Sequence, residues 1–184
     1  VKRFEEALTK SGGHLSTLCV NSASAGLELM LRWFGVKEGD EVIVPAYTYT
    51  ATANVVVHCG AKPVLVDIGD DFNISVKNIE KAISSRTKVI MPVDLGGFPC
   101  DYDEINALVR RSDIISLFNP TTKEQNQLGR ILVLSDAAHS IGAVYYGKKT
   151  GILTDITVYS FQAVKNLTTA EGGAVCLNLP APFD

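Results

Sequence analysis

The alternation of two hydrophobic patterns is the feature of this sequence that most constrains its fold. Short apolar runs rich in β-branched residues, typical of strands buried on both faces, alternate with segments whose apolar residues recur at helical spacing. This alternation predicts an α/β fold, a three-layer sandwich in which helices cover both faces of one large, mostly parallel sheet. The predicted strands are 18–20, 41–44, 63–66, 89–93, 131–135, 156–159 and 174–177.

The predicted helices lie between these strands. They are expected at 25–34, 50–59, 76–83 and 102–111, and the chain also begins inside an amphipathic helical pattern. Residues 117–130 are polar and rich in Asn, Gln and Thr, so we expect an irregular surface excursion there.

The length and the ends of the chain bound its organisation. A chain of 184 residues with 46% hydrophobic content predicts one domain with a sizeable core. Because the sequence starts within a helical pattern without an initiator Met, and residues 180–184 directly follow a predicted strand, we expect a fragment of a longer protein.

The charge and the cysteines exclude several classes of function. A net charge of -3 without a Lys/Arg cluster argues against nucleic acid or a membrane surface as partner. Neither a leader peptide nor an apolar stretch of roughly 18 residues occurs, so the cytoplasm is the expected location. The 4 cysteines are widely separated and form no C-x-x-C pair. They predict reduced, mostly buried thiols rather than a zinc site or another metal site.

Ligands of open parallel sheets bind where strands end at their carboxyl edge, and three polar segments lie at such places. The first, residues 21–26, joins a strand to a helix, where backbone N–H groups and the Ser24 hydroxyl would bind a phosphate. Ordinary N-capping by Ser22 or Ser24 is the alternative interpretation. No G-x-G-x-x-G or G-x-x-x-x-G-K-[ST] motif occurs, which disfavours a dinucleotide site or a P-loop.

The second polar segment is 135–139, in which Asp136 ends an apolar strand and His139 follows. A carboxylate at this place can hold a cationic ring nitrogen, and His139 can donate to an oxygen on the same ring. The alternatives are a helix cap for Asp136 and a hydrogen-bonded core histidine for His139.

The third polar segment is 160–166, which follows the strand 156–159 and contains Lys165. An amine held at this strand end is available for imine chemistry, and Ser160 can reach the same phosphate as Ser24. The alternative is a surface lysine near a loop. A phosphate cradle, a carboxylate and a lysine on three strands of one sheet are the parts that pyridoxal phosphate (PLP) requires.

Four segments carry a family resemblance: N-S-A-S-A-G-L-E-L, G-D-E-V-I-V-P-A-Y-T-Y-T-A-T-A-N, D-A-A-H-S-I-G-A and Y-S-F-Q-A-V-K-N-L-T-T-A-E-G-G. Read together, they resemble the DegT/StrS family of PLP-dependent sugar aminotransferases, in family order and over nearly the whole chain. The S-F-x-x-x-K-N block and D-A-A-H are the specific signals. The resemblance implies an aspartate-aminotransferase-like fold and a homodimer. It also implies amino transfer from glutamate to a nucleotide-linked keto sugar, such as a 4-keto-6-deoxyhexose, in cell-surface polysaccharide or amino-sugar biosynthesis.

The same resemblance implies roles for individual residues. Lys165 would bind PLP covalently, Asp136 would pair with the pyridine nitrogen, and His139 would hydrogen-bond near the ring hydroxyl. Further cofactor contacts are expected from Ser24, Ala25, Ser160, Tyr49 and Gln162, the first three at the phosphate, Tyr49 stacked on the ring and Gln162 beside the site. For Tyr49 the alternative is packing under the sheet. Residues 171–173 are expected to shape the turn after the lysine.

The resemblance also implies what this chain lacks and where it departs from the family. Residues 1–184 would form the PLP-binding large domain, without the N-terminal segment and the C-terminal small domain that help to build the substrate pocket. Asp94 stands where family members commonly have His. One alternative function is a sugar dehydratase of the same family, which carries His in place of Lys165. Another is a non-catalytic binding module, which retention of Lys165, Asp136 and His139 disfavours.

Overall fold

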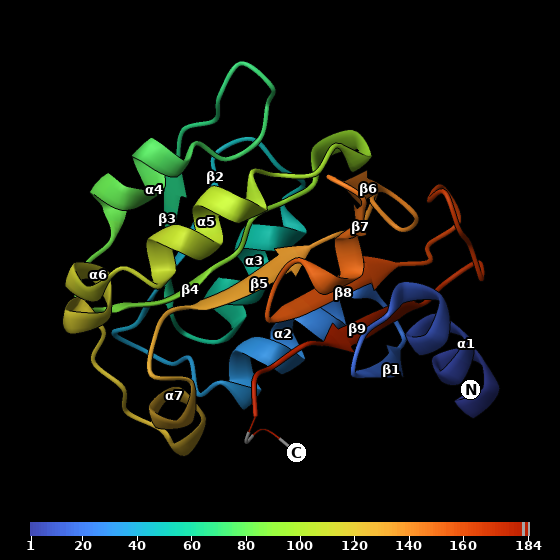
Figure 1. The fold of residues 1–184 in the computed structure, drawn as a ribbon, viewed down its shortest axis with the longest axis horizontal. Helices are drawn as coiled ribbons and strands as arrows, with labels where there is room; N and C mark the ends of the chain where they lie inside the picture. The colour runs from blue at the N-terminus through green and yellow to red at the C-terminus, as the bar shows by residue number, and fades with distance from the viewer. Residues whose placement is uncertain (182, 184) are drawn as a thin grey trace.

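Seven strands of the chain form a single sheet, in the order β1-β9-β8-β5-β4-β2-β3 (Figure 1). The computed structural model describes residues 1–181 and 183. Pro182 and Asp184, which belong to the segment 180–184 discussed above, lie outside the described residues. The strands of the sheet are β1 (Ser16–Val20), β2 (Glu41–Pro45), β3 (Lys62–Val66), β4 (Thr87–Ile90), β5 (Leu132–Asp136), β8 (Ile156–Ser160) and β9 (Gly173–Leu177).

The pairing of these strands brings most of their carboxyl ends to one edge. β2 pairs in parallel with β3 and β4, β4 with β5, and β5 with β8, whereas β9 pairs antiparallel with both β8 and β1. β1 therefore runs in the same direction as β8. The predicted α/β fold with a mostly parallel central sheet is confirmed, and the edge predicted to hold ligands exists.

Helices cover both faces of the sheet. α2 (Ala23–Trp33) and α3 (Ala51–His58) pack together on one face, and α5 (Tyr102–Val109) lies on the other (Figure 1). The remaining elements are α1 (Lys2–Gly12), α4 (Val76–Ala82), α6 (Ser112–Leu117), α7 (Lys123–Leu128), the 3-10 turns η1 (Leu95–Gly97) and η2 (Thr150–Ile152), and a small hairpin of β6 (Val144–Tyr145) and β7 (Lys148–Lys149).

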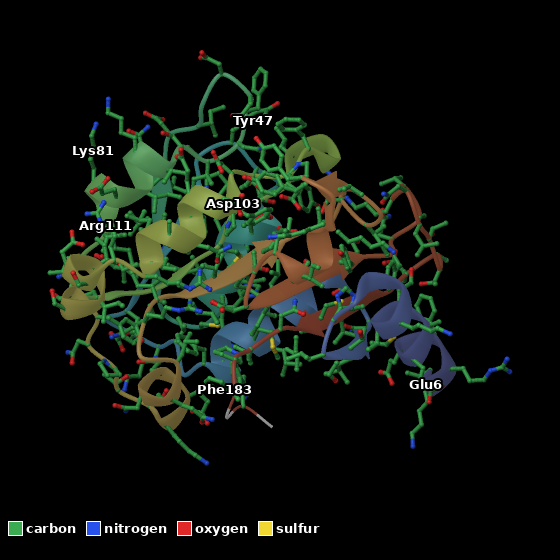
Figure 2. The ribbon with its side chains drawn as sticks, viewed as in Figure 1. Glu6, Tyr47, Lys81, Asp103, Arg111 and Phe183 are labelled. Atoms are coloured by element: carbon green, nitrogen blue, oxygen red, sulfur yellow. The ribbon has the colours of Figure 1, made fainter. Side chains whose placement is uncertain are left out.

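The central strands explain why the apolar runs of the sequence predict a sheet. Every residue of β2, β4, β5 and β8 is buried, whereas the outer strands β1 and β3 expose several residues. A strand covered on both faces must be apolar almost throughout, so its pattern is a continuous run. Charged side chains such as those of Glu6, Lys81 and Arg111 lie on the outside of the fold (Figure 2).

The segment 117–130 is more ordered than the sequence predicted. It contains α7, whose N-cap Thr122 accepts a hydrogen bond from the backbone N–H of Gln125 (3.2 Å). Gln125 is fully buried and donates to the carbonyl oxygen of Phe34 (2.9 Å), which ties the segment to the end of α2. The prediction of an irregular excursion was therefore wrong for α7. The T-x-x-Q pattern of a capping box was the signal that marks it.

The cysteines agree with the prediction of reduced, mostly buried thiols. All four cysteines are free, Cys59, Cys100 and Cys176 being buried and Cys19 partly buried. Within residues 1–181 and 183, no group of three or more His, Cys, Asp and Glu side chains is arranged to hold a metal ion. No helix in the same ranges has the length and apolar character needed to cross a membrane.

Gly173 begins β9 at the ligand edge, where three backbone segments meet. A Cβ atom at this position would lie 2.8 Å from backbone atoms of Ser22, Ala23 and Tyr159. Because backbone cannot move aside as a flexible side chain can, Gly173→Ala should lower the free energy of unfolding by about 1–3 kcal/mol. Denaturant unfolding of the full-length protein measures this difference. A variant as stable as the wild type would contradict such a close approach.

Candidate active site

A pocket of about 600 Å³ opens at the carboxyl edge of the sheet, where α2 and α3 begin and where β5 and β8 end. Its volume lies within the range of roughly 300–1,000 Å³ usual for ligand sites. All the predicted site residues except Ala25 line it, namely Ser24, Tyr49, Asp136, His139, Ser160, Gln162 and Lys165. The three polar segments of the sequence therefore meet in one cavity.

Asp136 is the last residue of β5 and is 6% exposed. Its Oδ2 accepts a hydrogen bond from the Thr52 hydroxyl (2.9 Å), and its Oδ1 accepts one from the backbone N–H of Ala138 (3.3 Å). Burial raises the pKa of Asp136, while these two hydrogen bonds oppose the rise. No helix begins after Asp136, so the helix-cap alternative is wrong. A buried carboxylate with free lone pairs is suited to a cationic partner in the pocket.

Lys165 and His139 lie in direct contact. The Nζ atom of Lys165 is 2.7 Å from Nε2 of His139. Partial burial and the neighbouring positive charge of Lys165 lower the pKa of His139. A neutral imidazole then accepts the hydrogen bond from the amine. His139 is exposed on a turn, so the alternative of a core histidine is wrong, and Lys165 is half-buried in the pocket wall rather than on an open surface.

The start of α2 forms the proposed phosphate end of the pocket. Ser22 is the N-cap, and its hydroxyl oxygen accepts from the backbone N–H of Ala25 (3.1 Å). The N-cap alternative therefore holds for Ser22, and the cap engages the N–H of Ala25. Ala23 and Ser24 lie in the first turn of α2, so their backbone N–H groups have no acceptor inside the helix. Both residues line the pocket together with Ser160 at the end of β8.

The remaining predicted residues shape the pocket wall. Tyr49 is 78% exposed, so the alternative that it packs under the sheet is wrong. Gln162 accepts a hydrogen bond from the backbone N–H of Val164 (3.1 Å) and so stabilises the turn that carries the lysine. Gly172, at φ +153°, accepts from the backbone N–H of Phe161 (2.8 Å), as expected of a turn-shaping segment.

Thr52 is a residue of the site that the sequence did not reveal. It is fully buried as the second residue of α3 and donates to Asp136, which is 84 positions away in the sequence. Its type and place near a helix start are ordinary. Only the folded structure, which brings the start of α3 to the end of β5, makes the contact visible.

Asp94 also lines the pocket but has its carboxylate engaged. It is 1% exposed and accepts hydrogen bonds from Tyr102 Oη (2.5 Å), Ser140 Oγ (2.5 Å) and the backbone N–H of Cys100 (3.1 Å). Burial raises the pKa of Asp94, and the three hydrogen bonds oppose this rise. Asp94 thus anchors the turn that carries His139.

Lys88 is the most buried lysine in the described part of the chain, yet it lies outside the pocket. Burial lowers its pKa, and its amine donates to the carbonyl oxygen of Asn119 and lies 3.9 Å from Asp40. It sits near the start of β4, at the edge opposite to the pocket. Lys88 therefore anchors the segment after α6.

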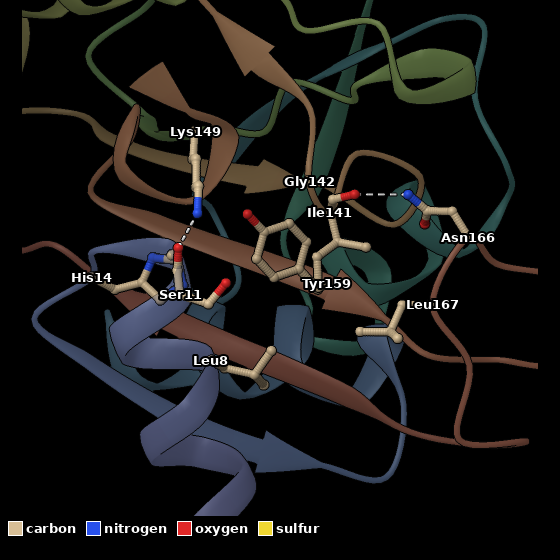
Figure 3. A pocket seen from close by; sticks show the side chains of 10 residues that line it. Leu8, Ser11, His14, Ile141, Gly142, Lys149, Tyr159, Asn166 and Leu167 are labelled. Atoms are coloured by element: carbon tan, nitrogen blue, oxygen red, sulfur yellow. Dashed lines mark hydrogen bonds between the residues drawn. The ribbon is translucent and has the colours of Figure 1, made fainter. Parts of the chain in front are cut away.

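A second cavity, of about 270 Å³, lies between α1 and the segment that follows Lys165 (Figure 3). The amine of Lys149 there donates to the carbonyl oxygen of Ser11 at the end of α1. On the other side of this cavity, the side chain of Asn166 donates to the carbonyl oxygen of Ile141 (2.8 Å), which links the lysine turn to the histidine turn. Lys149 lines this second cavity, whereas Lys165 lines the pocket that contains Asp136.

Comparison with known proteins gives one consistent family. The model of the DegT/DnrJ/EryC1/StrS aminotransferase family matches residues 1–119 and 123–182. The chain is 44% identical over 174 residues to the uncharacterized protein MJ1066 of Methanocaldococcus jannaschii, covering 94% of this chain and 41% of that protein. It is 40% identical over 179 residues to the GDP-perosamine synthase of Caulobacter vibrioides, covering 97% of this chain and 44% of the synthase.

A solved structure agrees with the sequence relatives. The Streptococcus pneumoniae protein Spr1654, described as a candidate sugar aminotransferase and solved in a PLP form, superposes with a TM-score of 0.94 at 45% identity. The match covers 98% of this chain and 46% of that one. The chain therefore spans less than half the length of the relatives that it matches.

Proposed function

Because this chain belongs to the DegT/DnrJ/EryC1/StrS aminotransferase family, we propose that it is the cofactor-binding large domain of a PLP-dependent sugar aminotransferase. The observation that carries the proposal is the presence of Lys165 and Asp136 in one cavity with the open start of α2. An N-terminal segment and a C-terminal small domain would complete the enzyme. The proposal includes a homodimer and a cytoplasmic location, which sedimentation and cell fractionation test.

The residues of the pocket fit PLP in their charges. The buried carboxylate of Asp136 suits a protonated ring nitrogen, because an ion pair offsets the cost of burying its charge. Ser24, Ser160 and the first N–H groups of α2 suit a phosphate, because a helix N-terminus presents unpaired donors and a positive dipole end. The positive ring nitrogen of PLP would thus meet the Asp136 carboxylate, and its negative phosphate would meet the start of α2.

Lys165 is the proposed acid and base of the reaction. PLP, when bound, supplies a ring that accepts the electrons of the bond broken at the amine-bearing carbon of the substrate. In amino transfer, a proton must leave one carbon and join another, and the Lys165 amine is the group that takes and returns it. Neutral His139, 2.7 Å away, holds this amine in place by accepting its hydrogen bond. Asp136 holds the negative charge that keeps the ring nitrogen protonated.

Glutamate is the proposed amino donor and a nucleotide-linked 4-keto-6-deoxyhexose the proposed acceptor. The Caulobacter vibrioides relative supports a nucleotide-linked substrate, since it is named for the synthesis of GDP-perosamine. The full-length enzyme with PLP and glutamate should change its absorbance from the PLP form to the pyridoxamine form. A keto sugar of this class should then restore the first spectrum, and the kinetics should be ping-pong.

The same experiment separates the alternatives. If glutamate produces the pyridoxamine form but only α-keto acids discharge it, the enzyme is an amino-acid aminotransferase and the sugar assignment fails. If glutamate leaves the spectrum of bound PLP unchanged, transamination itself is wrong. A protein that stays colourless with PLP would be a binding module without the cofactor.

A further inference from the structure

Thr52 uses its hydroxyl in an unusual way for a threonine in a helix. Such hydroxyls commonly bond to a backbone carbonyl three or four residues earlier. Thr52 is fully buried, and its Oγ1 instead lies 2.9 Å from Oδ2 of Asp136, on a neighbouring strand. An ionised carboxylate only accepts, so the single hydrogen of the Thr52 hydroxyl is directed to Asp136.

A short chain of hydrogen bonds therefore ends at the carboxylate. Thr48 Oγ1 lies 2.9 Å from Thr52 Oγ1, and because the hydrogen of Thr52 is already committed, Thr48 must donate. Thr48 lines the pocket, whereas Thr52 lies behind it. The direction of donation runs from Thr48 through Thr52 to Asp136, so both hydroxyl dipoles favour negative charge on the carboxylate.

This contact also fixes the rotation of the carboxylate. Oδ2 is held by Thr52, and Oδ1 is held by the longer contact with the backbone N–H of Ala138 (3.3 Å). A carboxylate oxygen accepts about two hydrogen bonds, so each oxygen keeps one position free for a ligand. Burial raises the pKa of Asp136, and the Thr52 hydroxyl is the largest of the influences that lower it again.

We propose that Thr52 is a positioning residue for the cofactor's ring nitrogen: its hydroxyl fixes the Asp136 carboxylate in one rotation and keeps it ionised. The inference rests on the proposed function, because the ring nitrogen is that of PLP. Thr52 would act wholly through Asp136, without touching the cofactor.

The test is the pH dependence of pyridoxamine phosphate binding to full-length Thr52→Val enzyme. Pyridoxamine phosphate is the probe because it carries the ring and forms no covalent bond to Lys165. In the wild type, its affinity should fall on the acid side, where Asp136 must lose a proton to pair with the ring. Valine keeps the shape of threonine but removes the donor, so the pKa of Asp136 should rise. The acid limb should therefore move to higher pH, by roughly one to two units.

Two matched variants isolate the hydroxyl. Thr52→Ser restores the donor, so it should return the acid limb to its wild-type position. Thr87→Val removes another fully buried hydroxyl, which accepts from the backbone N–H of Ser84 (3.0 Å) near the opposite edge of the sheet. It should leave the limb unchanged. If Thr52→Val does not fold, Thr52→Ala takes its place.

The outcomes are distinct. An acid limb that stays in place in Thr52→Val, or an affinity loss of the same factor at every pH, would make Thr52 a packing residue only and overturn the inference. A wild-type enzyme that binds neither PLP nor pyridoxamine phosphate would instead overturn the proposed function, and the inference with it. A shifted limb that Thr52→Ser restores supports both.

Discussion

Lys165→Ala should abolish amino transfer by the full-length enzyme while leaving PLP bound without a covalent link. The loss should be large, on the order of the 10⁶-fold fall in kcat that follows removal of the nucleophile of a serine protease. The reason is that the Lys165 amine is the one that shares the pocket with Asp136, so no other lysine of the described residues can take over its proton transfers. Steady-state turnover with glutamate and a keto sugar measures the effect.

A lysine outside the pocket provides the control for that result. The amine of Lys149 donates to the carbonyl oxygen of Ser11 beside the second cavity, so Lys149→Ala should keep turnover close to that of the wild type. Turnover of Lys165→Ala at the wild-type rate would show that another group performs the chemistry.

Asp136→Asn should cost roughly 2–5 kcal/mol of transition-state stabilisation, as for truncated buried charge pairs. This corresponds to about a 30- to 5,000-fold loss of kcat/KM. Asparagine keeps the size of the side chain but removes the charge that holds the ring nitrogen protonated. Burial already raises the pKa of Asp136, so loss of its charge should not unfold the protein. The effect should therefore fall on chemistry rather than on stability.

An exposed carboxylate serves as the control. Asp103 lies on the outer surface of α5, so Asp103→Asn should leave the rate unchanged. Rates for both variants should be read beside denaturant unfolding curves. Should Asp136→Asn retain the full rate, or unfold at ordinary temperature, Asp136 would be a structural residue.

The strands were predictable because a strand that is buried on both faces consists of a continuous run of apolar residues. Their ends were less so, since pairing partners decide them. β1 starts at Ser16 because it pairs with β9, and β4 ends at Ile90, after which Val93 forms only an isolated bridge to Asp136. The hairpin of β6 and β7 and the helix α7 are too short to produce a periodic pattern.

The site, like the fold, contains residues that the sequence predicts and residues that only the structure shows. Residues just after strands, such as Asp136 and Lys165, were predictable because a parallel sheet gathers its strand ends at one edge. The contact of Thr52 with Asp136 and that of Asp94 with Ser140 were not, because the partners of these hydrogen bonds are 84 and 46 positions apart. Local sequence carries no record of such contacts. Ala25 was expected to contact the phosphate. In the structure its backbone N–H donates to the side chain of Ser22, the N-cap of α2, and the sequence did not decide between Ser22 and Ser24 as that cap.

Borohydride reduction of the full-length enzyme with PLP, followed by peptide mapping, tests the central assignment most directly. Reduction fixes the cofactor covalently to the amine that holds it. The pyridoxyl group should lie on the peptide that contains Lys165, and this peptide should carry no label in Lys165→Ala. A pyridoxyl group on Lys149, on Lys88 or on any other lysine of the wild-type enzyme would show that Lys165 does not hold the cofactor.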